Sequence, residues 1–197
     1  MILQPLLVHI LQKFPWLIDT FSLEPQRIVS HDRMILEQVI LPSFASTTTI
    51  QKVLFVGCAA YTQQYKDIFR EKEYWTIDPK RVKKKYGSER HIVDSIIKIE
   101  TYITKDYFDV IIMNGVIGFG LNRIGDIEQA INACYATLAG QGILLVGWND
   151  TARRIPTDIR AIHALGKFRP YHFEPLQACH YRTEGLQRHT LSFYQKV

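Results

Sequence analysis

Small or polar side chains follow directly after four apolar segments of the chain. These groups occupy residues 57–62, 78–79, 94–95 and 114–116. A glycine at position 57 lets the backbone turn sharply and approach a ligand closely. Asp78 lies 21 residues after Gly57, where a carboxylate can accept hydrogen bonds from ribose hydroxyls. These two features suit a ligand that contains a ribose.

Two more polar residues extend the pattern toward a nucleoside. Asp94 can accept a hydrogen bond from an adenine amino group, and Asn114 offers both donor and acceptor groups to polar ligand atoms. An aspartate at a strand end often serves only as a helix cap, so each residue alone says little. The four groups in order, each after a predicted strand, favour a binding site.

The elements that must position these groups alternate between two kinds. Strands are predicted at residues 52–57, 74–78, 91–94, 108–114, 142–148, 168–174 and 189–196. Helices are predicted at residues 61–71, 95–103, 124–139 and 156–165. This alternation indicates an α/β fold with a mostly parallel, doubly wound sheet, and the last two strands, with no helix between them, indicate an antiparallel addition. Ligands of such sheets bind beyond the C-terminal ends of the strands, so the polar groups should meet there.

Two helical segments precede the first strand. The apolar side chains of residues 1–18 form a helical stripe, and a second amphipathic helix is predicted over residues 31–44, ending before Pro42 breaks it. We therefore expect a helical N-terminal extension, residues 1–45, before the main domain, residues 46–197. The extension is expected to cover the core or form a homodimer surface, since it lacks the basic polar face of a membrane-surface helix.

Length and composition predict a soluble cytoplasmic protein. A chain of 197 residues suits one domain with a sizeable core, and no apolar run is long enough to span a bilayer. The oily N-terminus has no basic leader and no cleavage site, so no signal peptide is expected. Cys58, Cys134 and Cys179 match no zinc pattern and are expected to be reduced thiols, and no metal site is predicted.

A nicotinamide dinucleotide is one alternative for the nucleoside-type site. Its fingerprint needs glycine at three positions, so that pyrophosphate can sit on a helix N-terminus. Here Gly57, Ala59 and Thr62 occupy those positions, with Tyr61 beside them, and the loop is crowded for pyrophosphate. A ligand without phosphate fits such a loop better.

The motifs resemble those of class I methyltransferases that use S-adenosylmethionine (SAM). Residues 53–62 are similar to the family's first motif, 75–79 to the second, 91–94 to the third and 108–116 to the fourth. The resemblance covers about residues 50–197 and implies a Rossmann-like sheet of about seven strands with an antiparallel C-terminal strand. It implies SAM as cofactor, bound by Gly57, Cys58, Ala59, Tyr61, Asp78, Pro79, Asp94, Ser95, Asn114, Gly115 and Val116.

The first motif departs from the family pattern at three positions. Phe55 stands where the family often has an acid, and Ala59 and Tyr61 stand where it has further glycines. These departures concern the seating of the methionine part of SAM. They leave open the alternative that the protein is a methyltransferase-like module that binds a partner without catalysis.

The expected reaction is methyl transfer from SAM to an oxygen or nitrogen of a small acceptor. The sulfonium already activates the methyl group, so the protein need mainly align the nucleophile and exclude water. No catalytic base is identified.

Local positive charge bears on the acceptor. Residues 80–85 carry five positive charges, and residues 151–197 hold eight Lys or Arg against three Asp or Glu. Arginine can bind two oxygens of a carboxylate or phosphate, which favours a small anionic acceptor near Arg153, Arg154, Arg182 and Arg188. RNA is the competing interpretation of the same charge, although the chain shows no separate nucleic-acid-binding domain.

Overall fold

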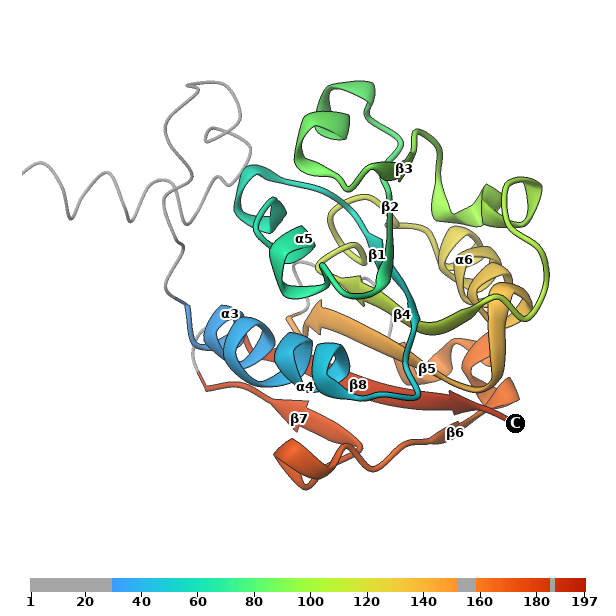
Figure 1. The fold of residues 1–197 in the computed structure, drawn as a ribbon. Helices are drawn as coiled ribbons and strands as arrows, with labels where there is room; N and C mark the ends of the chain where they lie inside the picture. Colours follow the sequence, from blue (N-terminus) through green and yellow to red (C-terminus); the bar gives the residue numbers. More distant parts are fainter. Residues whose placement is uncertain (1–29, 152–158, 185–186) are drawn as a thin grey trace, which may run out of the picture.

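The computed structural model describes residues 30–151, 159–184 and 187–197. These residues form a single eight-stranded sheet in the order β3-β2-β1-β4-β5-β8-β6, with β7 also paired to β8 (Figure 1). The strands are β1 (Lys52–Val56), β2 (Glu73–Ile77), β3 (Arg90–Ile92), β4 (Phe108–Asn114), β5 (Leu138–Asn149), β6 (Phe168–Pro170), β7 (His180–Arg182) and β8 (His189–Lys196).

The strand directions confirm the predicted α/β class. Strands β1 to β5 pair in parallel, whereas β8 pairs antiparallel with β5, β6 and β7. The C-terminal strand therefore runs against all the others. The eighth strand, β7, is absent from the seven predicted because its residues, His180, Tyr181 and Arg182, contain no run of apolar side chains.

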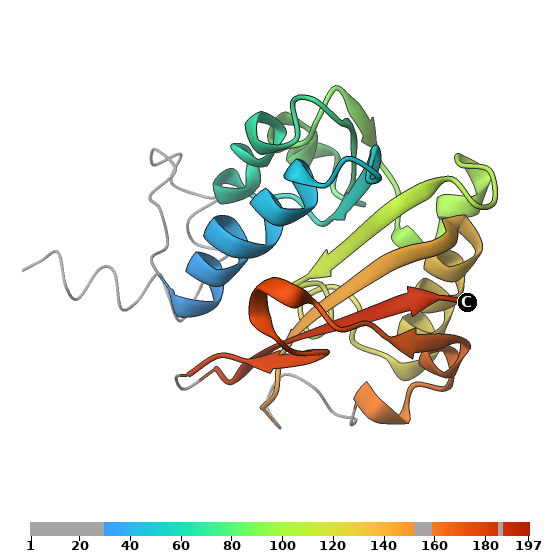
Figure 2. The same cartoon turned by 60° about the horizontal axis from the view of Figure 1, so that its bottom comes forward.

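Apolar layers cover both faces of the sheet. On one face, α6 (Ile124–Thr137) packs with the short helical turn Ile96–Thr101 against β4 and β5. On the other face, residues 31–46 form one long helical segment whose buried side chains meet those of β1, β4, β5 and β8. Figure 2 shows this segment and α6 on opposite sides of the strands.

The segment 31–46 does not end before Pro42, as the sequence predicted. It runs through α3 (His31–Ile35), a π-helical turn at Leu36–Ile40 and α4 (Leu41–Ser46). The change from π to α hydrogen bonding places Pro42 in the first turn of α4, where a backbone N–H is not needed. The proline therefore ends one hydrogen-bonding pattern without ending the helix.

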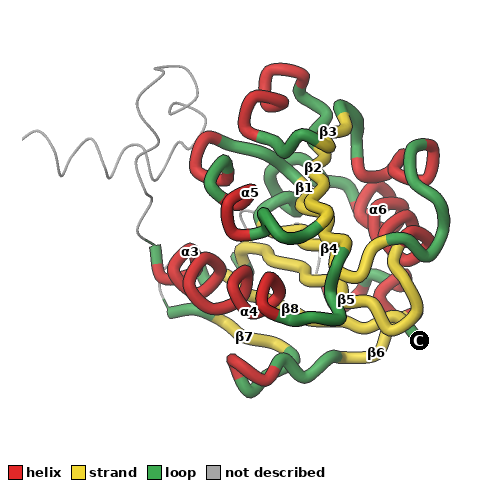
Figure 3. The backbone as a smooth tube through the Cα atoms, viewed as in Figure 1, coloured by secondary structure: helices red, strands yellow, loops and turns green. Residues whose placement is uncertain are grey.

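Two predicted helices of the sheet connections are much shorter than expected. The segment 61–71 contains only the 3₁₀ turn Ala60–Thr62 and α5 (Tyr65–Ile68). The segment 95–103 contains the 3₁₀ turn Ile96–Thr101, in which three β-branched isoleucines disfavour a regular α-helix. Figure 3 shows loops and short turns, rather than long helices, joining β1 to β4.

The remaining short elements lie outside the sheet's central strands. They are the 3₁₀ turns Arg81–Tyr86, Ile159–Ala161, His163–Lys167 and Glu174–Leu176. The predicted helix 1–18 and part of the predicted helix 156–165 lie outside the described residues. Across the described part of the chain, no helix has the length and apolar character needed to cross a bilayer.

Candidate functional site

A cavity of about 280 Å³ opens where β1, β2 and β4 end. Gly57 begins the loop after β1 with φ of 86°, a conformation that glycine adopts without strain. Its amide donates to the Ile77 carbonyl at 2.8 Å, and a Cβ at this position would lie 3.4 Å from the Val116 side chain. The loops after β1 and β4 are therefore in close contact, as the sheet topology predicts.

Asp78 ties the loop after β1 to the end of β2. Its Oδ2 accepts the Cys58 amide at 2.8 Å, and its Oδ1 accepts the Lys80 amide at 2.8 Å. The side chain is largely buried, with 8% of its surface exposed. A carboxylate oxygen has more than one lone pair, so each oxygen can still accept a hydrogen bond from a hydroxyl in the cavity.

Ten of the eleven predicted cofactor-binding residues line this cavity. They are Gly57, Cys58, Ala59, Tyr61, Asp78, Pro79, Ser95, Asn114, Gly115 and Val116. Four loops far apart in sequence, those after β1, β2, β3 and β4, thus supply one surface, which is the arrangement that the strand-end rule predicts.

Asp94 is the residue that the structure does not bring to the cavity. Its carboxylate accepts the Ser95 amide at 2.7 Å and the Tyr102 hydroxyl at 2.8 Å, and Lys98 lies 3.8 Å away. The Ser95 amide, followed by the Tyr102 hydroxyl, lowers the pKa of Asp94. Ser95 is the N-cap of the following turn, and Asp94 binds both ends of that turn through the Ser95 amide and the Tyr102 hydroxyl, which is a structural role.

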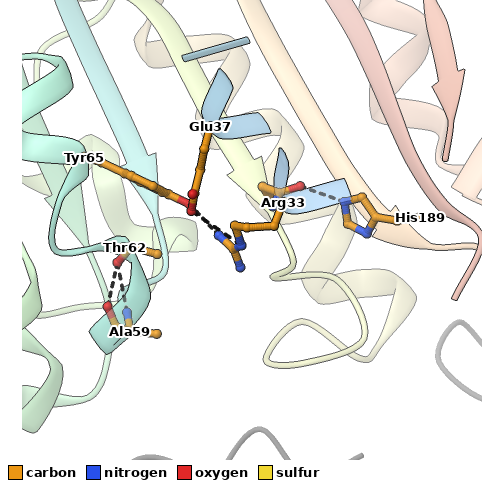
Figure 4. A network of polar contacts seen from close by, with 7 residues as sticks. Arg33, Glu37, Ala59, Thr62, Tyr65 and His189 are labelled. Carbon is orange, nitrogen blue, oxygen red and sulfur yellow. Dashed lines mark hydrogen bonds and ion pairs between the residues drawn. The ribbon is translucent and has the colours of Figure 1, made fainter. Parts of the chain in front are cut away.

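Arg33, on α3, lines the same cavity and was missed by the sequence analysis. Its guanidinium donates to the Tyr65 hydroxyl at 2.5 Å and lies over the Tyr61 ring at 4.1 Å. The Tyr65 hydroxyl donates to Glu37, whose carboxylate also lies 3.8 Å from the Arg33 Nε (Figure 4). Two tyrosines and one acid therefore hold a nearly buried cation at the wall of the cavity.

The protonation states of this cluster follow from its burial. Burial opposes the charge on Arg33, but Tyr65, Tyr61 and Glu37 outweigh it and raise the Arg33 pKa. Burial also raises the pKa of Tyr65, so its hydroxyl stays protonated and donates to Glu37. Arg33 is a permanent cation that faces any ligand in the cavity.

One signal in the sequence points to Arg33 in retrospect. Arg33 and Glu37 are four residues apart on the stripe that carries Leu36, Ile40 and Phe44, and these apolar side chains are all buried. A charged pair on the buried face of an amphipathic helix needs a special environment. Periodicity shows the face, but it does not show that this face lies against the cavity.

The departures from the family's first motif belong to the same cluster. The Phe55 ring packs edge-on against Tyr65, with centroids 5.2 Å apart, and the Tyr61 ring stacks on Arg33. Thr62 closes the loop by accepting the Ala59 amide and donating to the Ala59 carbonyl. Aromatic side chains at positions 55 and 61 thus support the arginine.

The geometry of the loop after β1 is unfavourable for a dinucleotide. A pyrophosphate needs the free amides of a well-formed helix N-terminus, yet α5 has only four residues and is preceded by a 3₁₀ turn. Burial, followed by the nearby Asp78, raises the pKa of the Cys58 thiol to about 12, so this thiol is not a nucleophile. Among the described residues, no cluster of three metal-ligating side chains occurs.

The predicted acceptor-binding arginines are only partly described. Arg153 and Arg154 lie outside the described residues. Arg182 lies 3.9 Å from Asp150 with its side chain half exposed, and Arg188 is exposed directly before the last strand. In the basic segment 80–85, Lys80 and Lys83 line the cavity, whereas Arg81, Lys84 and Lys85 are exposed.

Known proteins match this chain in fold, but the sequence comparisons found no match. No protein-family model matches the sequence, and no curated protein matches it. The structure is similar to the N-methyltransferase NodS from Bradyrhizobium japonicum WM9, with a TM-score of 0.62 and 17% identity, covering 84% of this chain and 96% of NodS.

Two further solved structures give the same result. A SAM-dependent methyltransferase from Archaeoglobus fulgidus has a TM-score of 0.57 and 13% identity, with 82% of this chain and 91% of that chain covered. The 1,6-didemethyltoxoflavin-N1-methyltransferase of Burkholderia thailandensis has a TM-score of 0.54 and 12% identity, with 79% and 76% covered. The chain therefore has the Rossmann-like fold of the SAM-dependent methyltransferases.

Proposed function

We propose that this protein is an enzyme that transfers the methyl group of SAM to an oxygen or nitrogen of a small acceptor. One observation carries the proposal: the loops predicted to bind the cofactor line a single cavity in a methyltransferase fold. The structural relative NodS has been solved with S-adenosylhomocysteine, which supports the choice of cofactor.

The side chains around the cavity fit the polar groups of SAM. Asp78 has lone pairs left for the ribose hydroxyls, and Ser95 with Ile96 forms the part of the wall suited to adenine. Arg33, a cation held by Tyr61 and Tyr65, fits the carboxylate of the methionine part. The ribose hydroxyls are thus matched by the Asp78 carboxylate, the adenine by the wall at Ser95 and Ile96, and the methionine carboxylate by the Arg33 cation.

Bound SAM would supply an activated methyl group on its sulfonium. The protein then has to hold an acceptor oxygen or nitrogen in line with that methyl and exclude water. Asn114, at the end of β4, and Asn149, at the end of β5, lie on the side of the sheet where such an acceptor would enter.

Titration calorimetry with SAM, S-adenosylhomocysteine and NAD tests the cofactor assignment. We expect the first two to bind and NAD not to bind. Asp78→Ala should weaken binding by about 1–3 kcal/mol, because ribose hydroxyls lose their acceptor. Asp94→Ala is the matched control, since that strand-end acid does not line the cavity, and its affinity should equal that of wild type. Equal affinity of wild type and Asp78→Ala would refute the assignment.

We propose an anionic group on the small acceptor. Arg182 and Arg188 are exposed near the C-terminal ends of β5 and β7, where a carboxylate or phosphate can reach them. Methyl transfer to small carboxylic acids and to matched neutral compounds tests this. We expect Arg182→Ala to lower turnover of the acids, and equal turnover of neutral acceptors would contradict the proposal.

RNA is a second candidate acceptor, favoured by the position of the basic segment 80–85. Lys80 and Lys83 line the cavity while Arg81, Lys84 and Lys85 remain exposed beside it. A polyanion bound there would release counterions, so its affinity should fall steeply with salt. Salt-sensitive RNA methylation that Arg81→Glu/Lys84→Glu abolishes would establish this candidate, and unchanged activity in that variant would exclude it.

We also place the protein in the cytoplasm. The three cysteines, all free thiols in the structure, support a reducing compartment. Fractionation of cells that express the full chain tests this location.

A further inference from the structure

A glycine in the middle of the sheet leaves room for a contact between strands that are not neighbours. Gly147 of β5 pairs with Asn114 of β4 on one side and with Leu191 of β8 on the other. A Cβ at position 147 would lie only 1.9 Å from the Asn114 side-chain oxygen and 3.0 Å from His189 Nε2. Only glycine at this position lets the His189 side chain reach Asn114 across β5.

His189 bridges the ends of two strands through both ring nitrogens. Its Nε2 lies 2.8 Å from the Asn114 side-chain oxygen, and its Nδ1 lies 2.7 Å from the Asn149 side-chain oxygen. The ring is almost fully buried, with 4% of its surface exposed. The Asn149 amide nitrogen in turn donates to Gln187 at 3.2 Å.

The imidazole is neutral at physiological pH. Burial lowers the pKa of His189 to about 4, Asp32 opposes the shift, and Arg33 acts in the same direction as burial. A neutral imidazole has one N–H donor and one acceptor nitrogen, so it cannot donate to the oxygens of both asparagines.

The neighbours of the ring decide which nitrogen carries the proton. Asn149 uses its amide nitrogen for Gln187, so its oxygen faces Nδ1 and accepts a hydrogen bond from the Nδ1–H group. Nε2 must then accept from the Asn114 NH₂ group, which requires a half-turn of the side-chain amide from the orientation in which its oxygen faces Nε2. After this half-turn, the Asn114 oxygen faces away from His189, and Asn114 is one of the residues that line the cavity.

We propose that His189 is a positioning residue that holds Asn114 as a hydrogen-bond acceptor for the ammonium group of the cofactor's amino acid part. This inference rests on the proposed function. The carboxylate and the ammonium of an amino acid share one carbon, so their partners must lie close together. Arg33 and Asn114 both line the cavity, and Arg33 lies near His189 (Figure 4). The two ends of the amino acid thus meet a cation and an amide oxygen.

Nuclear magnetic resonance of the full chain with ¹⁵N-labelled histidine tests the positioning. We expect His189 of the wild type to be neutral with its proton on Nδ1. Asn114→Asp should raise the His189 pKa strongly, because a carboxylate then faces Nε2 in addition to the nearby Asp32. Asn132→Asp, on α6 beside Lys167, is the matched control and should leave this pKa unchanged. A proton on Nε2 in the wild type, or an unchanged pKa in Asn114→Asp, would overturn the inference.

Calorimetry with two ligands tests the ammonium contact. S-adenosylhomocysteine carries the amino acid part, whereas methylthioadenosine lacks it. His189→Gln keeps an acceptor at the position of Nε2 and should bind both ligands as the wild type does. His189→Asn reaches only as far as Nδ1 and should bind S-adenosylhomocysteine roughly tenfold more weakly, with methylthioadenosine unaffected. Equal losses for both ligands, or equal behaviour of the two variants, would overturn the proposal.

The two measurements separate failure of this inference from failure of the proposed function. If wild type bound neither ligand, the assignment of the cofactor would fail. The resonance experiment would still report on the His189–Asn114 contact, because it needs no ligand.

Discussion

Asp78 and Asp94 show how the same residue type after two neighbouring strands takes two different roles. Asp78 follows β2, and its carboxylate turns toward the amides of Cys58 and Lys80 at the cavity. Asp94 follows the edge strand β3, and its carboxylate accepts the Ser95 amide and the Tyr102 hydroxyl of the next turn. The amides available near each strand end decide the direction of each carboxylate, and that choice lies outside what spacing can predict.

At the same scale, His189 should make stability depend on pH. Its folded-state pKa of about 4 lies below the ordinary value of about 6.5, so the unfolded chain binds the proton more readily. This contribution to stability is complete above about pH 6.5 and is lost as the pH falls toward 4. The loss between pH 7.5 and 5 should be about 2 kcal/mol for this group.

Urea unfolding of the wild type and His189→Gln at both pH values measures that contribution. Because glutamine does not titrate, the variant should lose about 2 kcal/mol less than wild type over this interval. The comparison cancels the other titrating groups, which both proteins share. The same pH dependence in both proteins would show that His189 is not held neutral.

At the scale of the element, the helical segment 31–46 has two roles. It buries Leu36, Ile40, Leu41 and Phe44 against the sheet, and it carries Arg33 to the cavity. The apolar stripe that the sequence predicts therefore packs against the sheet of the same chain. Because packing holds the segment in place, it also holds the position of the arginine.

Phe44→Ala should destabilise the protein by about 3–5 kcal/mol, since a fully buried ring is removed and a cavity remains. The Phe44 ring also packs on Phe173, with centroids 5.4 Å apart. Thermal or urea unfolding measures the loss. Met34→Ala, on the exposed side of the same segment, should change stability by less than about 0.5 kcal/mol. Similar losses in the two variants would contradict the packing described.

At the scale of the whole molecule, the segment 31–46 joins the N-terminal part of the chain to the core. The expected boundary between residues 1–45 and 46–197 falls inside this segment, and residues 1–29 lie outside the described part. We propose that the main domain does not fold without residues 30–46, because their apolar side chains cover one face of the sheet.

Deletion of residues 1–46 tests this dependence. The uncovered sheet should expose a large apolar surface, bind the dye ANS and lose its near-ultraviolet circular dichroism. A cooperative unfolding transition with the midpoint of the full chain would show that residues 47–197 fold independently. Full-length Phe44→Ala, which should weaken the same contact without removing it, is the intermediate case.

The sequence by itself determined the α/β class, the mostly parallel direction of the strands and the loops that line the cavity. Strand periodicity is local, and parallel strands place their C-terminal ends at one edge, so Gly57, Asp78 and Asn114 follow from pattern and topology alone. The short turns after β1 and β3 were predicted less well, because tertiary contacts override weak helical propensity.

Only the tertiary structure decided which distant side chains complete the site. Arg33 lies 24 residues before Gly57, and it reaches the cavity because the segment 31–46 packs on one particular face of the sheet. His189 reaches Asn114 only because β8 pairs with β5 and Gly147 leaves a gap. Such contacts depend on the relative placement of whole elements, which periodicity along the chain does not predict.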